Sequence, residues 1–152
     1  MRTSLFSAKA EYACIAVLEL AAHYSDPQPL RLKDITDVHE IPQRFLVQIL
    51  LQLKGAGLVI STRGASGGYL LARAPDKISL ADVVRVIDRS DAMDLPGEKT
   101  PKIDKMPETP GIHVIRSVWR DVQAAQRRIL EQTTLAELVR RSQEDFALSY
   151  NI

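Results

Sequence analysis

Residues 35–71 read ITDVHEIPQRFLVQILLQLKGAGLVISTRGASGGYLL, and this stretch decides the fold of the chain. A short apolar segment comes first, a helix-length segment opened by a proline follows, and two β-rich segments with glycines between them come last. Pro42 suits the first turn of a helix, where its missing N–H would have no partner. Gly55 and Gly57 favour the end of that helix. This order is typical of a winged helix-turn-helix, in which the two strands form the wing.

The segment 42–54 predicts a helix with two unlike faces. Apolar residues recur at the spacing of one buried stripe, at Leu46, Ile49, Leu50 and Leu53. The opposite face carries Arg44, Val47, Gln48 and Leu51, with Gln43 and Lys54 at its edges. Glutamine and arginine can make paired hydrogen bonds with adenine and guanine edges, and an apolar side chain such as Val47 can contact a thymine methyl. We therefore expect base contacts from Gln43, Arg44, Val47 and Gln48; the alternative is an ordinary solvated face.

Two short segments rich in β-forming residues, 58–63 and 69–73, predict the hairpin of the wing. Glycines between them supply the positive φ angles that a hairpin tip needs. Arg63 and Gly64 lie at this tip, where an arginine suits the narrow minor groove of DNA because the negative potential is strongest there. The glycines do not fit a phosphate-binding loop, since no lysine follows them. They do not fit a dinucleotide fingerprint either, since a strand follows instead of a helix.

The remaining chain is mostly helical by its apolar spacing. Five further helices are expected, two of them opened by capping boxes at Ser79–Asp82 and Thr134–Glu137. They span residues 8–24, 32–39, 113–132 and about 134–141, and a fifth begins at Ser79 with Val83, Val84, Val86 and Ile87 inward. Residues 90–112 alternate prolines with charged residues, which predicts a flexible loop because little apolar surface can be buried there.

The expected long helix carries an apolar stripe of Ile115, Val118, Trp119, Val122 and Ile129. Leaving such a stripe in water costs about 25 cal/mol per Å². A second copy of the chain would cover it, and a dimer is also what a winged helix needs to read two half-sites one DNA turn apart. We expect a homodimer; the alternative is that the stripe packs on the chain's own first helix.

A length of 152 residues fits one domain, or a small domain plus an accessory helix. With the expected elements it predicts a mainly α protein with a small β-hairpin: a winged helix-turn-helix over 1–89, a flexible loop over 90–112, and a dimerisation helix and C-terminal helix over 113–152. The net charge of +1 does not decide for or against nucleic acid. Positive charge is nevertheless concentrated on the predicted helix and wing. Between residues 35 and 73 the basic residues are Arg44, Lys54, Arg63 and Arg73, whereas the acids are Asp37 and Glu40.

Neither an apolar run long enough to span a membrane nor a signal peptide is present in the sequence, so a cytoplasmic protein is expected. Cys14 is the only cysteine; a small buried hydrophobe is a better interpretation of it than a redox switch. The histidines are far apart and do not have metal-ligand spacing. Because no catalytic set stands out either, we expect neither a metal site nor an enzyme.

Several motifs together resemble one known family over nearly the whole chain. They are Lys9 and Tyr12, Ile41–Leu50, Leu53–Val59, Arg63–Leu71 with its Arg-Gly-x-x-Gly-Gly-Tyr wing, Ile78–Leu80 and Val118–Asp121. The chain resembles the Rrf-two family of bacterial winged-helix transcription regulators, which includes IscR-like iron–sulfur regulators. The resemblance implies a homodimer built through the long helix on a pseudo-palindromic operator of double-stranded DNA. Recognition helices would lie in major grooves and wing arginines in minor grooves, with Lys9, Arg44, Gln48, Arg63 and Gly64 among the DNA-binding residues.

The chain departs from that family at its sensor. Cluster-binding members carry three cysteines in the loop before the long helix, and some add a histidine near the Trp-Arg-Asp motif. Here residues 90–112 contain no cysteine, and Arg116 stands in the place of the histidine. Cysteine thiolates are the usual ligands of such clusters, and Cys14 cannot supply three. No iron–sulfur cluster is expected, and Val47 in place of a family glutamate predicts a different base preference.

These observations predict a dimeric, sequence-specific transcription regulator without a cluster, a repressor that acts by occupying its operator. The alternative is a winged-helix protein-interaction module that docks on a metabolic enzyme. A small enzyme is a poor third hypothesis.

Overall fold

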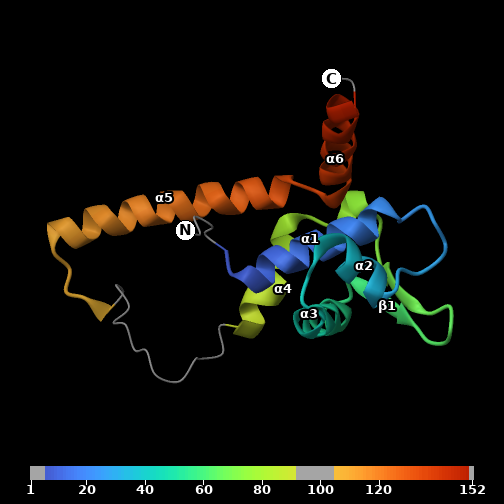
Figure 1. Cartoon of the computed structure of the whole chain (residues 1–152). Helices are drawn as coiled ribbons and strands as arrows, with labels where there is room; N and C mark the ends of the chain where they lie inside the picture. Colours follow the sequence, from blue (N-terminus) through green and yellow to red (C-terminus); the bar gives the residue numbers. More distant parts are fainter. Residues whose placement is uncertain (1–5, 92–104, 151–152) are drawn as a thin grey trace.

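A computed structural model of the chain describes residues 6–91 and 105–150. Its elements are α1 (Ala8–Ala22), α2 (Leu32–His39), α3 (Gln43–Gly55), β1 (Val59–Thr62), β2 (Gly68–Leu71), the 3₁₀ turn η1 (Pro75–Lys77), α4 (Leu80–Asp91), α5 (Pro110–Gln132) and α6 (Leu135–Tyr150). The predicted class, mainly α with a small hairpin in winged helix-turn-helix order, is confirmed (Figure 1).

The core of the winged unit forms around α1, which contacts α2, α3, α4, α6 and β2. The inner face of α1 is lined by Ala10, Ala13 and Ala16, each at most 1% exposed, so other helices can approach its backbone closely. α3 packs here with the stripe that the periodicity predicted, and its four residues Leu46, Ile49, Leu50 and Leu53 are all buried. The orientation of α3 is therefore fixed by its own apolar face.

The wing is a two-stranded antiparallel hairpin in which Val59 pairs with Leu71 and Thr62 with Gly68. Residues before α2 extend it, because Leu30 and Tyr69 exchange N–H···O bonds of 3.0 and 2.8 Å. A Cβ on Gly68 would lie 2.3 Å from the Leu30 carbonyl oxygen, so this pairing requires glycine. The strands are shorter than the predicted 58–63 and 69–73, since Arg63 already belongs to the turn.

The bounds of the first and third helices differ from the predicted ones. α1 ends at Ala22, not Tyr24, because the N–H of His23 already caps it, and the Tyr24 side chain is 45% exposed. Pro42 is the N-cap of α3 and not its first residue. Its backbone is extended, and its carbonyl accepts the N–H groups of Phe45 and Leu46. The bounds predicted for α2 are confirmed.

The helices near the C-terminus are longer than predicted. α5 begins at Pro110, not His113, because the Thr109 hydroxyl accepts the N–H of Ile112 at 3.2 Å and starts the helix earlier. α4 reaches Asp91, so the expected loop over 90–112 is shorter at both ends; residues 92–104 lie outside the described residues.

α6 extends past the predicted end at residue 141 to Tyr150. Ion pairs one turn apart support its first half, where Arg140 contacts both Glu137 and Glu144. Hydrogen bonds from Arg140 and then Arg141 lower the pKa of Glu137 to about 2.

The start of α6 closes the winged unit across a long sequence separation. The N–H of Leu80 donates to the Thr133 carbonyl, and the N–H of Leu135 donates to the Ile78 carbonyl, both at 2.9 Å. Leu135 is fully buried in the core. The capping box at Ser79 and Asp82 is complete, with bonds of 3.2 and 3.0 Å. At Thr134 the hydroxyl accepts the Glu137 N–H, whereas the Glu137 carboxylate pairs with arginines.

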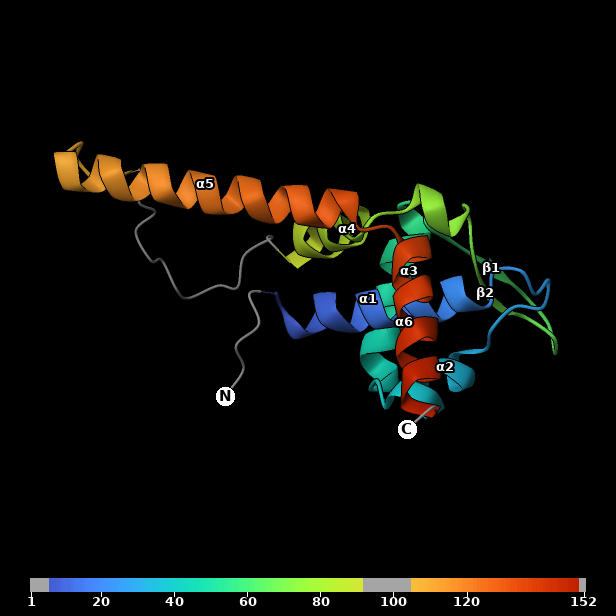
Figure 2. The same cartoon turned by 90° about the horizontal axis from the view of Figure 1, so that it is seen from above.

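α5 projects from this unit as a long rod, with its C-terminal half next to α4 and its N-terminal half away from the other described helices (Figure 2). None of its residues is buried. No helix within residues 6–91 and 105–150 combines the length and the apolar composition needed to cross a bilayer.

Candidate nucleic-acid interface

The outer face of α3 is presented to solvent as the sequence predicted. Gln43, Arg44, Val47 and Gln48 are all exposed, whereas the opposite side of the same helix is buried. The turn that leads into α3 is anchored in the core by Ile41, which is only 2% exposed, and Glu40 before it adopts a left-handed conformation at φ 53°. The α2–α3 pair therefore holds the four predicted base-reading residues on one face of a fixed helix.

Arg44 does not project freely from this face. Its guanidinium lies over the Phe45 ring, 5.1 Å from the centroid, and the Phe45 ring is 6.1 Å from that of Tyr12 on α1. A cation–π contact at an exposed site contributes about 0.5–1 kcal/mol. Arg44 is thus drawn to one side of α3. The outward line of the helix is formed by Val47 and, one turn later, Leu51, which is 64% exposed.

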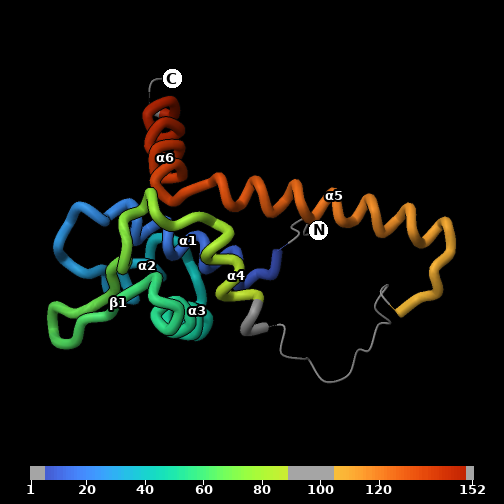
Figure 3. Tube along the Cα trace, turned by 180° about the vertical axis from the view of Figure 1, so that it is seen from behind, coloured from blue at the N-terminus to red at the C-terminus, as the bar shows by residue number. Residues whose placement is uncertain are grey.

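The wing tip places Arg63 and Gly64 in solvent. Gly64 has φ +108°, a conformation that side-chain-bearing residues rarely adopt. A further residue braces the tip: Nη2 of Arg31 donates a 3.0 Å hydrogen bond to the Ala65 carbonyl. Spacing in the sequence contains no signal for this contact, because 34 positions separate the two residues. Both α3 and the hairpin lie at the edge of the winged unit away from α6 (Figure 3).

Lys9 lies in the first turn of α1, half-buried, where it already takes part in an interaction. It precedes Tyr12 by about one turn, and the Tyr12–Phe45 contact makes the first turns of α1 and α3 neighbours. Lys9 is therefore near the start of α3, whereas the wing tip is at the other end of α1 (Figure 1). The structure thus brings the four α3 residues together on one face, and it places Lys9 and Arg63 far from each other.

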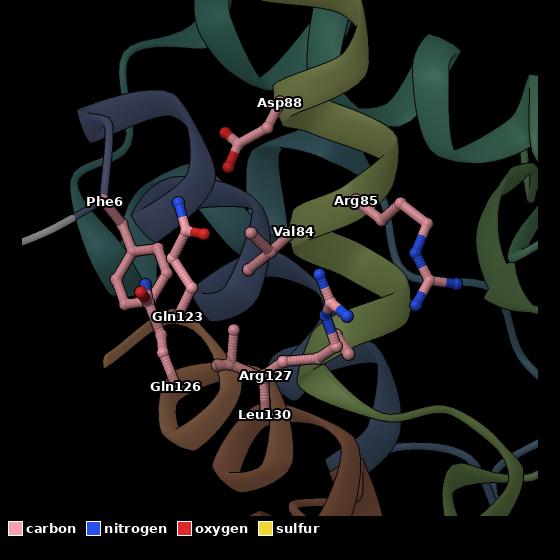
Figure 4. Close-up of a pocket in the computed structure, with 9 residues that line it drawn as sticks. Phe6, Val84, Arg85, Asp88, Gln123, Gln126, Arg127 and Leu130 are labelled. Atoms are coloured by element: carbon pink, nitrogen blue, oxygen red, sulfur yellow. The ribbon is translucent and has the colours of Figure 1, made fainter. Parts of the chain in front are cut away.

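A hollow of about 350 Å³ lies between the start of α1, α4 and the C-terminal half of α5 (Figure 4). Phe6, Val84 and Leu130 form its apolar wall, and Gln123 and Arg127 lie at its polar side. The same apolar wall borders a second hollow of about 380 Å³ whose lining includes Cys14. Burial, with smaller contributions from Asp88 and Glu11, raises the pKa of Cys14 to about 11, so the thiol is protonated at neutral pH.

The apolar stripe of α5 is exposed in the single chain. Its side chains Ile115, Val118, Trp119, Val122 and Ile129 are 46–64% accessible. The alternative in which this stripe packs on the chain's own first helix is therefore wrong. What faces the winged unit is the neighbouring side of α5, with Gln126 and Leu130.

Arg116, at the position that the family resemblance gives to a ligand histidine, has a structural partner. Its guanidinium donates to Glu108 Oε1 at 2.8 Å and to the Met106 carbonyl at 3.3 Å, and its side chain is 17% exposed. A guanidinium has no lone pair available for a metal. Among the described residues, no group of three or more histidine, cysteine, aspartate or glutamate side chains could hold a metal ion.

The sequence pattern of the family Rrf2, described as an iron-dependent transcriptional regulator, matches residues 6–141. The chain belongs to the Rrf2 family. One relative, the HTH-type transcriptional regulator IscR of Erwinia tasmaniensis, is 37% identical over 134 residues, which are 88% of this chain and 77% of that protein.

Two solved Rrf2 structures have the same fold. IscR from T. potens superposes with a TM-score of 0.74 at 32% identity, covering 94% of this chain and 91% of that one. CymR, the global cysteine regulator of B. subtilis, gives a TM-score of 0.71 at 31% identity, covering 91% and 98%. The resemblance inferred from the wing and recognition-helix motifs is confirmed, and with it the class of DNA-binding transcription regulators.

Proposed function

We propose that this Rrf2 protein is a cytoplasmic repressor that binds a pseudo-palindromic operator in double-stranded DNA as a homodimer, without an iron–sulfur cluster. The observation that carries the proposal is the outer face of α3. It exposes Gln43, Val47 and Gln48 on a helix whose other side is locked in the core, next to a wing with an exposed arginine. A repressor of this kind acts by occupying the operator.

The homodimer is supported by the unpartnered stripe of α5. In a symmetric antiparallel pair of such helices, the N-terminal half of one lies along the C-terminal half of the other. The stripe around Val118 and Val122 would then be covered. The partner helix would also lie near the hollow that Phe6, Val84 and Leu130 border, because Gln126 and Leu130 on the neighbouring side of α5 line it.

The absence of a cluster is supported by donor chemistry, although the family is described as iron-dependent. The sequence has one cysteine, Cys14, and its raised pKa disfavours the thiolate that a metal needs. Arg116 brings a positive charge to the start of α5, where a cluster ligand would be expected from the resemblance. Protein purified without oxygen should show neither visible cluster absorbance nor stoichiometric iron; both together would overturn this part of the proposal.

DNA binding is tested by gel shift against the region upstream of the protein's own gene. The wild type should form a salt-sensitive, sequence-preferring complex, because Lys and Arg contacts to phosphates release counterions. Arg63→Ala should weaken this complex about tenfold, while Arg128→Ala, an exposed arginine on α5, should leave it unchanged. An unaltered complex with Arg63→Ala, or only sequence-independent binding by the wild type, would contradict the proposal.

A further inference from the structure

The centre of the outer face of α3 is apolar. Val47 is 38% exposed and Leu51 64% exposed, one helical turn apart. Gln43, Gln48 and Lys54 surround them at the edges of this face. Arg44, the one long cationic side chain of the first turn, is held aside over Phe45. The exposed face of α3 therefore includes a pair of branched aliphatic side chains.

The described chain leaves much of Leu51 and a smaller part of Val47 open to solvent. The other leucine and isoleucine side chains of α3 are at most 1% exposed, so α3 does not lack burial for its aliphatic residues in general. A base pair offers only one apolar group in the major groove, the C5-methyl of thymine. An apolar ridge on a helix that enters this groove has that methyl as its natural partner.

We propose that Val47 and Leu51 each contact a thymine methyl in the operator half-site, so that the half-site carries two thymines about two base pairs apart. This inference rests on the DNA binding proposed above. Four residues of helix rise by about 6 Å, and successive base pairs are separated by about 3.4 Å. A helix lying along the groove therefore places its two aliphatic side chains over positions about two base pairs apart, on either strand.

The size of the effect follows from the burial of one methyl. Burying a CH₂-sized group contributes about 0.8 kcal/mol, which corresponds to about a fourfold change in affinity. Two thymine methyls should together contribute about 15-fold. The glutamines on either side keep their hydrogen-bonding role, and the aliphatic pair adds selectivity for thymine over cytosine and over uracil.

The test replaces thymine by deoxyuridine in a duplex obtained by in vitro selection with the full-length protein. This substitution removes only the C5-methyl and keeps every hydrogen-bonding group of the base. Each thymine of the half-site is replaced in turn, and dissociation constants are measured for wild type, Val47→Ala, Leu51→Ala and the control Ile60→Ala. Ile60 is 47% exposed on β1 and is a matched aliphatic residue outside α3.

We expect two positions, about two base pairs apart, at which deoxyuridine weakens wild-type binding three- to fivefold. At one of them Leu51→Ala should abolish the difference between thymine and uracil, and at the other Val47→Ala should do so. Ile60→Ala should leave both differences intact. Because both α3 side chains are exposed, circular dichroism of each variant should match the wild type.

Three results would overturn the inference. The first is equal binding of thymine and deoxyuridine at every position. The second is that Leu51→Ala lowers affinity equally for the thymine duplex and the deoxyuridine duplex, which would instead indicate a protein-docking surface. The third is selection of half-sites without paired thymines. A protein that selects no sequence at all would overturn the proposed function itself, and gel shift with random DNA distinguishes that outcome from the first three.

Discussion

The winged unit and α5 solve the burial of apolar side chains in opposite ways. In the winged unit, Ile35, Leu53 and Leu135 are fully buried, and strands, turns and helices from both ends of the chain contribute to one core. α5 has no buried residue, although its stripe includes Val118 and Trp119. One copy of the chain is thus sufficient to build the winged unit but not to cover the apolar stripe of α5. Contacts within one chain bury the apolar residues of the first, whereas the apolar stripe of the second stays exposed.

Leu53→Ala tests the core of the winged unit, which one copy of the chain completes. Leu53 is fully buried, so its truncation should lower the free energy of unfolding by about 2–5 kcal/mol through lost transfer energy and a residual cavity. Urea unfolding followed by circular dichroism measures this. A loss below about 1 kcal/mol would mean that the core of the winged unit is not closed around α3.

Val118→Glu tests the exposed apolar stripe of α5, which we propose is covered by a second copy. A carboxylate inside a helix–helix contact is costly to desolvate without a partner, so self-association should weaken by at least about 30-fold while the monomer keeps its helix content. Sedimentation equilibrium gives the dissociation constant. Ser117→Glu introduces the same charge on the adjoining, exposed position and should change association little. Equal effects of the two variants would remove the stripe from the interface.

Arg31→Ala tests a hydrogen bond of the winged unit that lies outside the core, from Arg31 to the Ala65 carbonyl. Loss of the hydrogen bond to the Ala65 carbonyl should loosen the wing tip and weaken DNA binding about two- to tenfold, the range for one hydrogen bond. The unfolding free energy should stay within about 0.5 kcal/mol, as for a surface substitution. Lys33→Ala, an exposed cation two residues further on in α2, serves as the matched control for lost charge. A similar loss of DNA binding in both variants would assign the effect to charge alone.

The smallest expected effect is the change that Cys14→Ala makes to the pH dependence of unfolding, since Cys14 lies where the winged unit meets α5. Its pKa of about 11 lies above its ordinary value, so the unfolded chain releases the thiol proton first as pH rises. The stability that this shift contributes is complete below about pH 8.5 and is lost as the pH approaches 11. Urea unfolding at pH 7.5 and pH 10 should therefore show a larger decline for wild type than for Cys14→Ala. Identical declines would mean that the thiol is not desolvated at the α1–α4 junction.

The parts that follow from local spacing could be predicted from the sequence. The bounds of α2, the buried stripe of α3 and the exposed stripe of α5 come from the repeat of apolar residues along one helix. The wing is predicted from the glycines between the two β-rich segments, because a tight hairpin turn requires them. These features depend on residues a few positions apart, so the pattern contains them.

The missed features depend on partners far apart in sequence or on the absence of a partner. Nothing in the spacing connects Arg31 to Ala65, or His39 to Glu19, whose side chains meet at 2.8 Å across α1 and α2. The sequence does not predict the end of α6, because residues 142–145 are all polar and interrupt the apolar repeat before Phe146. The apolar spacing places Leu51 on the outer face of α3, but only the structure shows that its side chain is 64% exposed.

The hydrogen bonds that join residues 78–80 to residues 133–135 also have a consequence for synthesis of the protein. Leu135 fills the core of a unit whose other elements have all been translated before α5 begins. A nascent chain that has just finished α4 therefore still has a gap in its core. The ribosome must add the whole of α5 before that gap can close. The long helix is consequently present whenever the winged unit reaches its final packing.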